Sequence, residues 1–304
     1  MTDYIKFDVG QGIQAASGEW YRCVQHLGTG GNAVTFLVLC TSGSHEGVLF
    51  ALKVFRKLSQ PERRERFLAE VDFLQGCDHP AVMRIFDRGN FQDKKQEFPF
   101  VVAEYLPTRL FDVIRSNSAN TTQKISFSLQ LLSALAYLEN LDPQVVHRDI
   151  KPQNVFVKGG ACVLGDFGLM KLLDGDLAED REIFKESVGQ GMPFFYRTPD
   201  LIGYARQECD LSVKSDVFQL GLVLCELFTG RNPACRPQDH LEPLEMEALG
   251  NIPGGLSGGI AGLLNRMIIM DPQERPAASE LLDGWQGLFS NAVDRAHDLD
   301  GRAI

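Results

Sequence analysis

Apolar and polar residues alternate through residues 20–55, and this pattern predicts strands in the first third of the chain. The segment favours β-branched and aromatic residues, and glycine-rich breaks at residues 28–31 and 41–47 divide it. We therefore expect three antiparallel strands joined by two turns. Residues 1–19 carry little pattern, and we expect them to form a leader.

The segment after these strands predicts one helix followed by two more strands. A capping-type start at residues 59–62 and a stop at Gly76 bound the helix. Its apolar stripe consists of Phe67, Val71 and Leu74. Short apolar runs at residues 82–86 and 98–107 then indicate strands, and the second run ends in a proline-bounded connector.

Helical periodicity dominates the remainder of the chain. Residues 124–141 place their apolar side chains on one broad face. Residues 214–228 are apolar nearly all round, which is typical of a buried helix. We expect further helices within residues 240–290 and a polar tail over residues 291–304.

Composition limits the classes of protein to consider. The chain has 304 residues with 44% hydrophobic content, enough for one large domain or two lobes with separate cores. A formal net charge of -10 argues against general nucleic-acid binding, which depends on neutralising phosphates. Seven cysteines lack Cys-x-x-Cys spacing and indicate free thiols in a reducing compartment. With neither a secretion signal nor an apolar run near the ~20 residues of a membrane helix, we expect a cytoplasmic protein that contacts no membrane.

The most informative stretch is residues 147–154, His-Arg-Asp-Ile-Lys-Pro-Gln-Asn. It follows an apolar helix and precedes a short strand-like run, so it is expected to be a loop between two packed elements. A turn carrying a few charges is the simpler interpretation. That interpretation does not explain why Asp149, Lys151 and Asn154 stand at these offsets.

A lysine inside an apolar strand is the second informative feature. Lys53 lies within residues 50–55, and a buried ammonium costs free energy unless it has a partner. It could be an edge-strand lysine whose side chain reaches water. Its best partner is Glu70, next to the apolar stripe of the following helix, whereas Glu65 falls off the stripe.

Two glycine-containing segments are weaker signals when each is taken alone. The turn at residues 27–34 contains glycines that would let phosphate oxygens approach the backbone, but most glycine-rich hairpins are only hairpins. Asp166 stands between two glycines within residues 165–168, which is often no more than a turn.

Taken together and in order, these motifs resemble those of the eukaryotic-type protein kinase family over roughly residues 20 to 288. The resemblance implies an α+β, bilobal fold. A small β-rich N-lobe with one key helix would occupy residues 20–106 and end in a hinge. A larger, mainly helical C-lobe would occupy residues 107–290.

The resemblance assigns roles to the polar groups. Asp149 would accept the proton of the attacking hydroxyl, and Lys151 would place positive charge on the phosphoryl group in transfer. Asn154 and Asp166 would hold Mg²⁺. Lys53 would bind the α/β-phosphates of ATP and pair with Glu70.

The same resemblance implies an adenine site. Backbone groups of Glu104 and Leu106 would pair with the adenine edge. The residues expected to enclose the ring are Leu27, Ala51 and Phe156. Gly28 and Gly30 would cover the phosphates, although the third glycine of the family pattern is Ala33 here. The small Ala103 before the hinge would leave a back pocket open beside Lys53 unless Phe73, Phe100 or Met83 fills it.

Three features concern the larger lobe. Asp216 is placed to accept hydrogen bonds from the backbone of residues 147–154. Asp200 stands where the family has glutamate and would pair with Arg275. Met192 stands near the threonine that Ser/Thr kinases carry in this segment.

Regulation is expected through the segment after Asp166. Arg148 precedes the expected base, and in the family such an arginine receives a phosphate from this segment. Ser187 is the only hydroxyl-bearing residue between Asp166 and Tyr196, so we expect its phosphorylation to order the segment. Alternatively, Asp180 or Glu186 supplies the charge constitutively, or no switch exists.

Lys151-Pro152 resembles Ser/Thr-directed kinases. The implied function is therefore a protein serine/threonine kinase that uses ATP and Mg²⁺ and acts on protein substrates, with the oligomeric state left open. Two alternatives remain, a pseudokinase that serves as a binding module and a small-molecule kinase.

Overall fold

The computed structural model describes residues 5–93, 96–173, 180–182, 184–185, 188, 194–236, 239, 241–242 and 244–300. The chain divides into two compact units. The smaller unit comprises Met1–Asp78 and Val82–Pro107, and the larger comprises His79–Ala81 and Thr108–Ile304.

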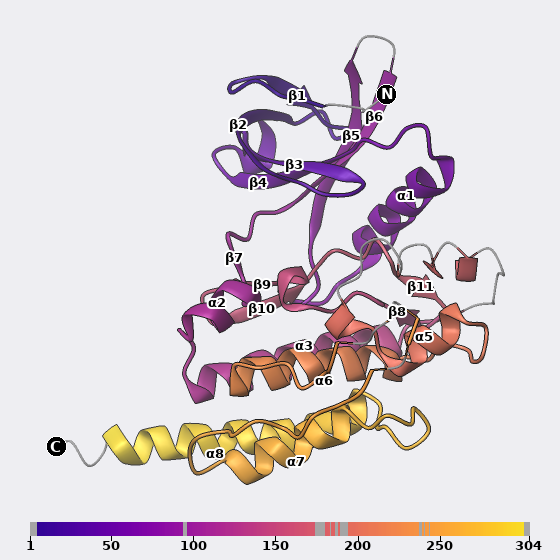
Figure 1. Ribbon diagram of the computed structural model, residues 1–304. Coiled ribbons are helices and arrows are strands. Elements are labelled where there is room, and N and C mark those ends of the chain that lie inside the picture. Colours follow the sequence, from indigo (N-terminus) through magenta and orange to yellow (C-terminus); the bar gives the residue numbers. More distant parts are fainter. Residues whose placement is uncertain are drawn as a thin grey trace. The chain divides into compact units, whose positions relative to one another are not determined.

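A six-stranded antiparallel sheet forms the smaller unit, with strand order β1-β2-β3-β4-β6-β5 (Figure 1). The strands are β1 Gly12–Gln14, β2 Trp20–Thr29, β3 Ala33–Cys40, β4 Leu49–Phe55, β5 Ile85–Asp93 and β6 Gln96–Glu104. One short 3-10 helix, Gly43–His45, lies between β3 and β4. The three strands predicted for residues 20–55 are confirmed, whereas the strand expected from residue 82 begins only at Ile85.

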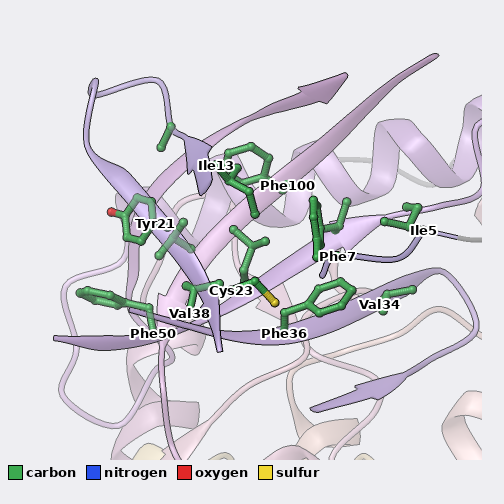
Figure 2. Close-up of a cluster of buried hydrophobic side chains, with 14 of the residues drawn as sticks. Ile5, Phe7, Ile13, Tyr21, Cys23, Val34, Phe36, Val38, Phe50 and Phe100 are labelled. Carbon is green, nitrogen blue, oxygen red and sulfur yellow. The ribbon is translucent and has the colours of Figure 1, made fainter. Parts of the chain in front are cut away.

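One face of this sheet is buried by the segment before β2. Ile5, Phe7, Ile13 and Ala15 join the buried cluster that includes Phe36, Phe50 and Phe100 (Figure 2). The Phe7 ring meets the Phe36 ring edge-on at 4.8 Å between centroids. Residues 5–15 are thus part of the core of this unit and not a separate leader. The two short alternations, Ile5 with Phe7 and Ile13 with Ala15, are too brief to register as strand periodicity.

Helix α1, Pro61–Gly76, contacts the opposite face of the sheet. Its predicted stripe is buried, and Phe67 and Val71 pack with Phe55 and Val101. The helix begins where the sequence predicted, but its N-cap is Gln60. Within the described residues the Gln60 side chain makes no capping hydrogen bond, so the expected capping box is not formed.

Helices make up most of the larger unit (Figure 1). They are α2 Leu110–Ser116, α3 Thr121–Glu139, α5 Pro199–Ala205, α6 Lys214–Thr229, α7 Ser257–Met267 and α8 Leu282–Asp300. Short 3-10 helices cover Pro152–Asn154, Phe194–Tyr196 and Ser279–Leu281. The short strands are β7 Thr108–Arg109, β8 Val145–Val146, β9 Val155–Lys158, β10 Ala161–Leu164 and β11 Lys171–Leu172.

Helix α6 is the centre of the larger unit and contacts both α3 and α7. It is buried on almost every side, as its apolar sequence predicted. It ends at Thr229, and the capping residue Gly230 has a φ of 75°, the left-handed conformation that glycine adopts after a helix C-terminus.

Helix α8 differs from the expected polar tail. It packs against α3 and α7, and it continues to Asp300 with Ala292 buried. The described part of the tail is therefore helical. Among the described residues, no helix is long and apolar enough to cross a membrane. A β-rich unit followed by a mainly helical one confirms the predicted α+β class.

Candidate active site

In the smaller unit, strand β4 and helix α1 bring Lys53 and Glu70 together. The Lys53 Nζ donates to Glu70 Oε1 at 2.9 Å and to Oε2 at 3.2 Å. Glu70 is buried, whereas the alternative partner Glu65 is exposed. A buried carboxylate requires a charged or hydrogen-bonding partner, and this pair supplies one to each side chain. The ammonium is thereby held at a defined place on the sheet.

The sheet face that carries Lys53 also carries two alanines. The β4–β6 register pairs Lys53 with Val101 and Ala51 with Ala103, and both alanines are half-buried. Phe100 belongs to the cluster on the opposite face, because successive strand residues point to opposite sides. Of the three side chains suggested to fill the space beside Ala103, Phe100 is therefore excluded.

The turn between β2 and β3 is held by two arginines. Arg56 donates from Nη2 to the Gly30 carbonyl at 2.9 Å, and Arg63 donates to Asn32 Oδ1 at 2.8 Å. A Cβ built on Gly28 would meet no atom of the described residues within 4 Å, and one on Gly30 would meet only the Ala33 carbonyl, at 3.6 Å. The hairpin itself does not require these glycines. They suit close approach of a ligand to the backbone.

The connector after β6 is the segment where the sequence predicts a hinge. The Glu104 N–H donates to the Arg84 carbonyl at 3.1 Å, and Glu104 pairs with Phe50 in the β4–β6 register. Leu106 is buried and Leu27 is partly exposed. Phe156 lies half-buried on β9 in the larger unit. The adenine contacts assigned to these residues stay predictions.

In the larger unit, the loop between β8 and β9 gathers Asp149, Lys151 and Asn154. The Lys151 Nζ donates to both Asp149 carboxylate oxygens, at 2.8 and 2.7 Å. The Asn154 amide donates to Asp149 Oδ2 at 2.8 Å and to the Asp149 carbonyl at 2.9 Å. These contacts fix the carboxylate in one orientation, as a proton acceptor requires.

Burial raises the pKa of Asp149 to about 6, although Lys151 and the Asn154 amide favour the ionised form. The nearby Asp166 carboxylate adds to the rise. A carboxylate with this pKa is ionised at neutral pH and is a stronger base than an exposed aspartate. The environment thus suits Asp149 to proton abstraction.

The buried ring of His147 is hydrogen-bonded to the backbone on both of its nitrogen sides. The Asp149 N–H donates to His147 Nδ1 at 3.2 Å, and His147 Nε2 lies 3.1 Å from the Gly165 carbonyl. Burial lowers the pKa of His147 to about 4. The ring is therefore neutral, and its proton is on Nε2, where it can be donated to Gly165. His147 links residues 147–154, named the catalytic loop below after the family resemblance, to the segment that carries Asp166.

Asp166 is exposed between the buried Gly165 and Phe167. Its φ of 61° lies in the left-handed region, which is uncommon outside glycine and is concentrated at functional sites. The Gly165 N–H donates to the Asn154 carbonyl at 3.0 Å, so the two expected metal ligands belong to hydrogen-bonded segments. Their carboxylate and amide oxygens are the ligand type that Mg²⁺ prefers.

Helix α6 supplies two buried polar groups to the catalytic loop. Asp216 accepts from the backbone N–H of His147 at 2.6 Å and of Arg148 at 3.0 Å, which confirms its predicted structural role. Burial raises the pKa of Asp216 to about 7.

The second group, Gln219, was missed by sequence reasoning. It accepts from the Ile150 N–H at 2.9 Å and donates to the carbonyls of Arg148 and Tyr196, at 3.2 and 2.8 Å. A polar side chain in a helix otherwise apolar all round was the available signal, since a buried amide must find partners.

The expected pair between Asp200 and Arg275 is formed. The guanidinium donates to both carboxylate oxygens, at 2.7 and 3.0 Å, and Arg275 is completely buried. The aspartate thus makes the contact despite being shorter than glutamate. Ser187 and Met192 lie outside the described residues.

Comparison with known proteins agrees with this geometry. The sequence model of the protein kinase domain matches residues 21–285. Carbon catabolite-derepressing protein kinase of Saccharomyces cerevisiae is 28% identical over 87% of the chain and 40% of its own length. Mitogen-activated protein kinase kinase kinase 5 of Arabidopsis thaliana is 30% identical over 81% of the chain and 34% of its length. Probable serine/threonine-protein kinase nek2 of Dictyostelium discoideum is 27% identical over 73% and 52%. The chain spans about half or less of the length of these relatives.

Proposed function

The chain belongs to the protein kinase domain family, and from that premise we propose that it is a protein serine/threonine kinase, transferring the γ-phosphoryl group of ATP to protein hydroxyls. The observation that carries the proposal is the Asp149 carboxylate, held by Lys151 and Asn154 with its pKa raised to about 6. This is a base positioned and tuned for a hydroxyl proton.

Each of the polar residues in the candidate active site has a separate role in phosphoryl transfer. Asp149 accepts the proton of the attacking hydroxyl, and the Lys151 ammonium, 2.7 Å from it, stabilises negative charge. Asn154 and Asp166 would hold Mg²⁺ through their oxygen atoms. ATP supplies the phosphoryl group when bound. The main contribution of the protein is to position these groups and to stabilise charge.

The smaller unit would hold the nucleotide. Lys53, oriented by Glu70 at 2.9 Å, offers an ammonium to phosphate oxygens. The open backbone at Gly28 and Gly30 fits phosphate cover. Ala51 would present only a methyl group to the adenine ring, and Ala103, opposite it on β6, would leave space behind the ring. The seven free cysteines support a reducing, cytoplasmic location.

Two other functions compete with this one. A pseudokinase would lack one of the reacting groups, yet Lys53, Glu70, Asp149, Asn154 and Asp166 are all present. A small-molecule kinase would have no need of the Asp200–Arg275 contact behind a peptide-docking segment, and that contact is formed. The relatives named as protein kinases also favour a protein substrate.

Incubation with labelled ATP, Mg²⁺ and a generic basic protein tests the proposal. The wild-type chain should label serine or threonine in that protein. Asp149→Asn should abolish transfer while ATP binding persists, because Asp149 meets the hydroxyl and not the nucleotide. Asp72→Asn, which changes an exposed carboxylate, is the matched control and should transfer normally. Labelling that persists in Asp149→Asn would remove Asp149 as the base. ATP binding without any transfer by the wild type would indicate a pseudokinase.

A further inference from the structure

Arg148 anchors the start of the segment that follows Asp166. It lies in the catalytic loop with a φ of 66° and is almost fully buried. Its Nε donates to the Leu169 carbonyl, and its Nη2 donates to the Met170 carbonyl at 3.1 Å. Directly beyond these residues, β11 pairs with β8, the strand that leads into the catalytic loop. The guanidinium therefore holds both chain segments in register.

The remaining face of this guanidinium is taken by a carboxylate from farther along the same segment. Arg148 Nη1 donates to Asp180 Oδ2 at 2.8 Å, and Nη2 donates to Oδ1 at 3.2 Å. This two-point geometry is the strongest form of arginine–carboxylate contact. The Phe184 ring, itself buried, lies 4.6 Å from the Arg148 guanidinium carbon.

Other groups also converge on Asp180. The Tyr204 hydroxyl donates to Oδ2 at 2.7 Å, and the Lys171 Nζ lies 3.7 Å from the same oxygen. Burial on its own would raise the pKa of Asp180. The Arg148 guanidinium, the Tyr204 hydroxyl and the Lys171 ammonium outweigh burial and hold the pKa below its ordinary value. Asp180 is therefore an ionised carboxylate at neutral pH.

We propose that Asp180 is a permanent anionic partner for Arg148 and a positioning residue for phosphoryl transfer, which makes the enzyme active without a phosphate on this segment. The proposal rests on the proposed kinase function. It adopts the constitutive-charge alternative over the expected switch at Ser187. Four donor contacts of Arg148 are already made to Leu169, Met170 and Asp180, so a phosphate could take the two-point Nη1–Nη2 face of the guanidinium only by displacing Asp180.

Phosphatase treatment gives the first test. Wild-type enzyme, treated with a broad phosphatase and shown by mass spectrometry to carry no phosphate on residues 169–197, should keep its kcat within about twofold. Ser187→Ala should behave in the same way. A loss of about tenfold or more in either preparation, restored by rephosphorylation, would overturn the proposal.

Substitution of Asp180 gives the second test. Asp180→Asn should lower kcat by about tenfold or more, with the Kd for ATP nearly unchanged, because the catalytic loop and not the nucleotide site is displaced. Asp180→Glu, which keeps the charge, should recover most of the activity. Asp210→Asn is the matched control, since it removes an exposed carboxylate 2.5 Å from the adjacent Arg181.

Should Asp180→Asn fail to fold, Tyr204→Phe removes one donor to Asp180 and keeps the arginine pair. It should lower kcat by a few-fold without changing the Kd for ATP. Asp180→Asn with wild-type kcat, or Asp180→Glu as inactive as Asp180→Asn, would refute the positioning role. If the untreated wild type transfers no phosphate to any protein, the kinase function itself fails, and this proposal fails with it.

Discussion

Lowering the pH should slow phosphoryl transfer with a midpoint near 6, set by Asp149. Burial raises the pKa of this carboxyl to about 6, and only its ionised form can accept the hydroxyl proton. The active fraction therefore falls as pH decreases through the pKa. About 99% of Asp149 is ionised at pH 8 and about 9% at pH 5, which predicts an approximately elevenfold loss of rate. An aspartate with an ordinary pKa would lose less than about a tenth of its rate over the same range.

The assay is single-turnover transfer at saturating ATP and Mg²⁺, quenched at intervals between pH 5 and 8. Chemistry must be followed directly, because product release limits kcat in many enzymes. The Kd for ATP, measured at each pH, separates loss of the base from loss of nucleotide. Circular dichroism at pH 5 checks that the chain stays folded.

Variants of Lys151 test whether the pKa of Asp149 sets the pH midpoint of phosphoryl transfer. Lys151 favours ionised Asp149 through its charge and its hydrogen bonds, so Lys151→Met should move the midpoint to higher pH. Lys151→Arg keeps the charge and should leave the midpoint close to that of the wild type. A wild-type midpoint near 4, or a Lys151→Met midpoint that does not rise, would refute the reasoning.

Three further substitutions have defined outcomes. Ala103→Met should weaken an adenine mimic bearing a bulky aromatic group by about tenfold, roughly 1.4 kcal/mol, while the KM for ATP holds; equal inhibition of both forms would mean that the pocket is closed. Asp200→Asn should reduce the free energy of unfolding in urea by about 3–5 kcal/mol, because Arg275 stays buried without its carboxylate, and a change below about 1 kcal/mol would contradict this. Gln219→Leu should reduce the free energy of unfolding by about 1–3 kcal/mol for each buried peptide group left unpaired, and it should also lower kcat. An unchanged kcat would show that the contacts of Gln219 are only structural.

The sequence was sufficient where one residue's neighbours along the chain specify its surroundings. Lys53 stands in an apolar strand, and the next helix along the chain carries Glu70 beside its apolar stripe, so the pair could be predicted. Asp216 could be predicted likewise, since a carboxylate in a buried helix needs donors. The same rule applies to Gln219, but its contacts were not predicted because its side chain is uncharged.

The sequence was insufficient where burial comes from a few residues or from distant ones. Residues 5–15 join the core through isolated side chains, and α8 continues past residue 291 although its sequence is polar. Hydrophobic periodicity detects neither, because it needs several repeats on one face.

The sequence by itself determined the order of the main α+β elements, the grouping of Asp149, Lys151 and Asn154 in one loop, and the Lys53–Glu70 pair. These depend on local composition and on spacings of a few residues. Only the tertiary structure decided which acid meets Arg148. Asp180 lies 32 residues from Arg148, in a polar segment where the sequence favoured a phosphate on Ser187 and left Asp180 and Glu186 as alternatives. Local pattern cannot rank such candidates, because the choice depends on which side chain reaches a buried guanidinium already fixed by Leu169 and Met170.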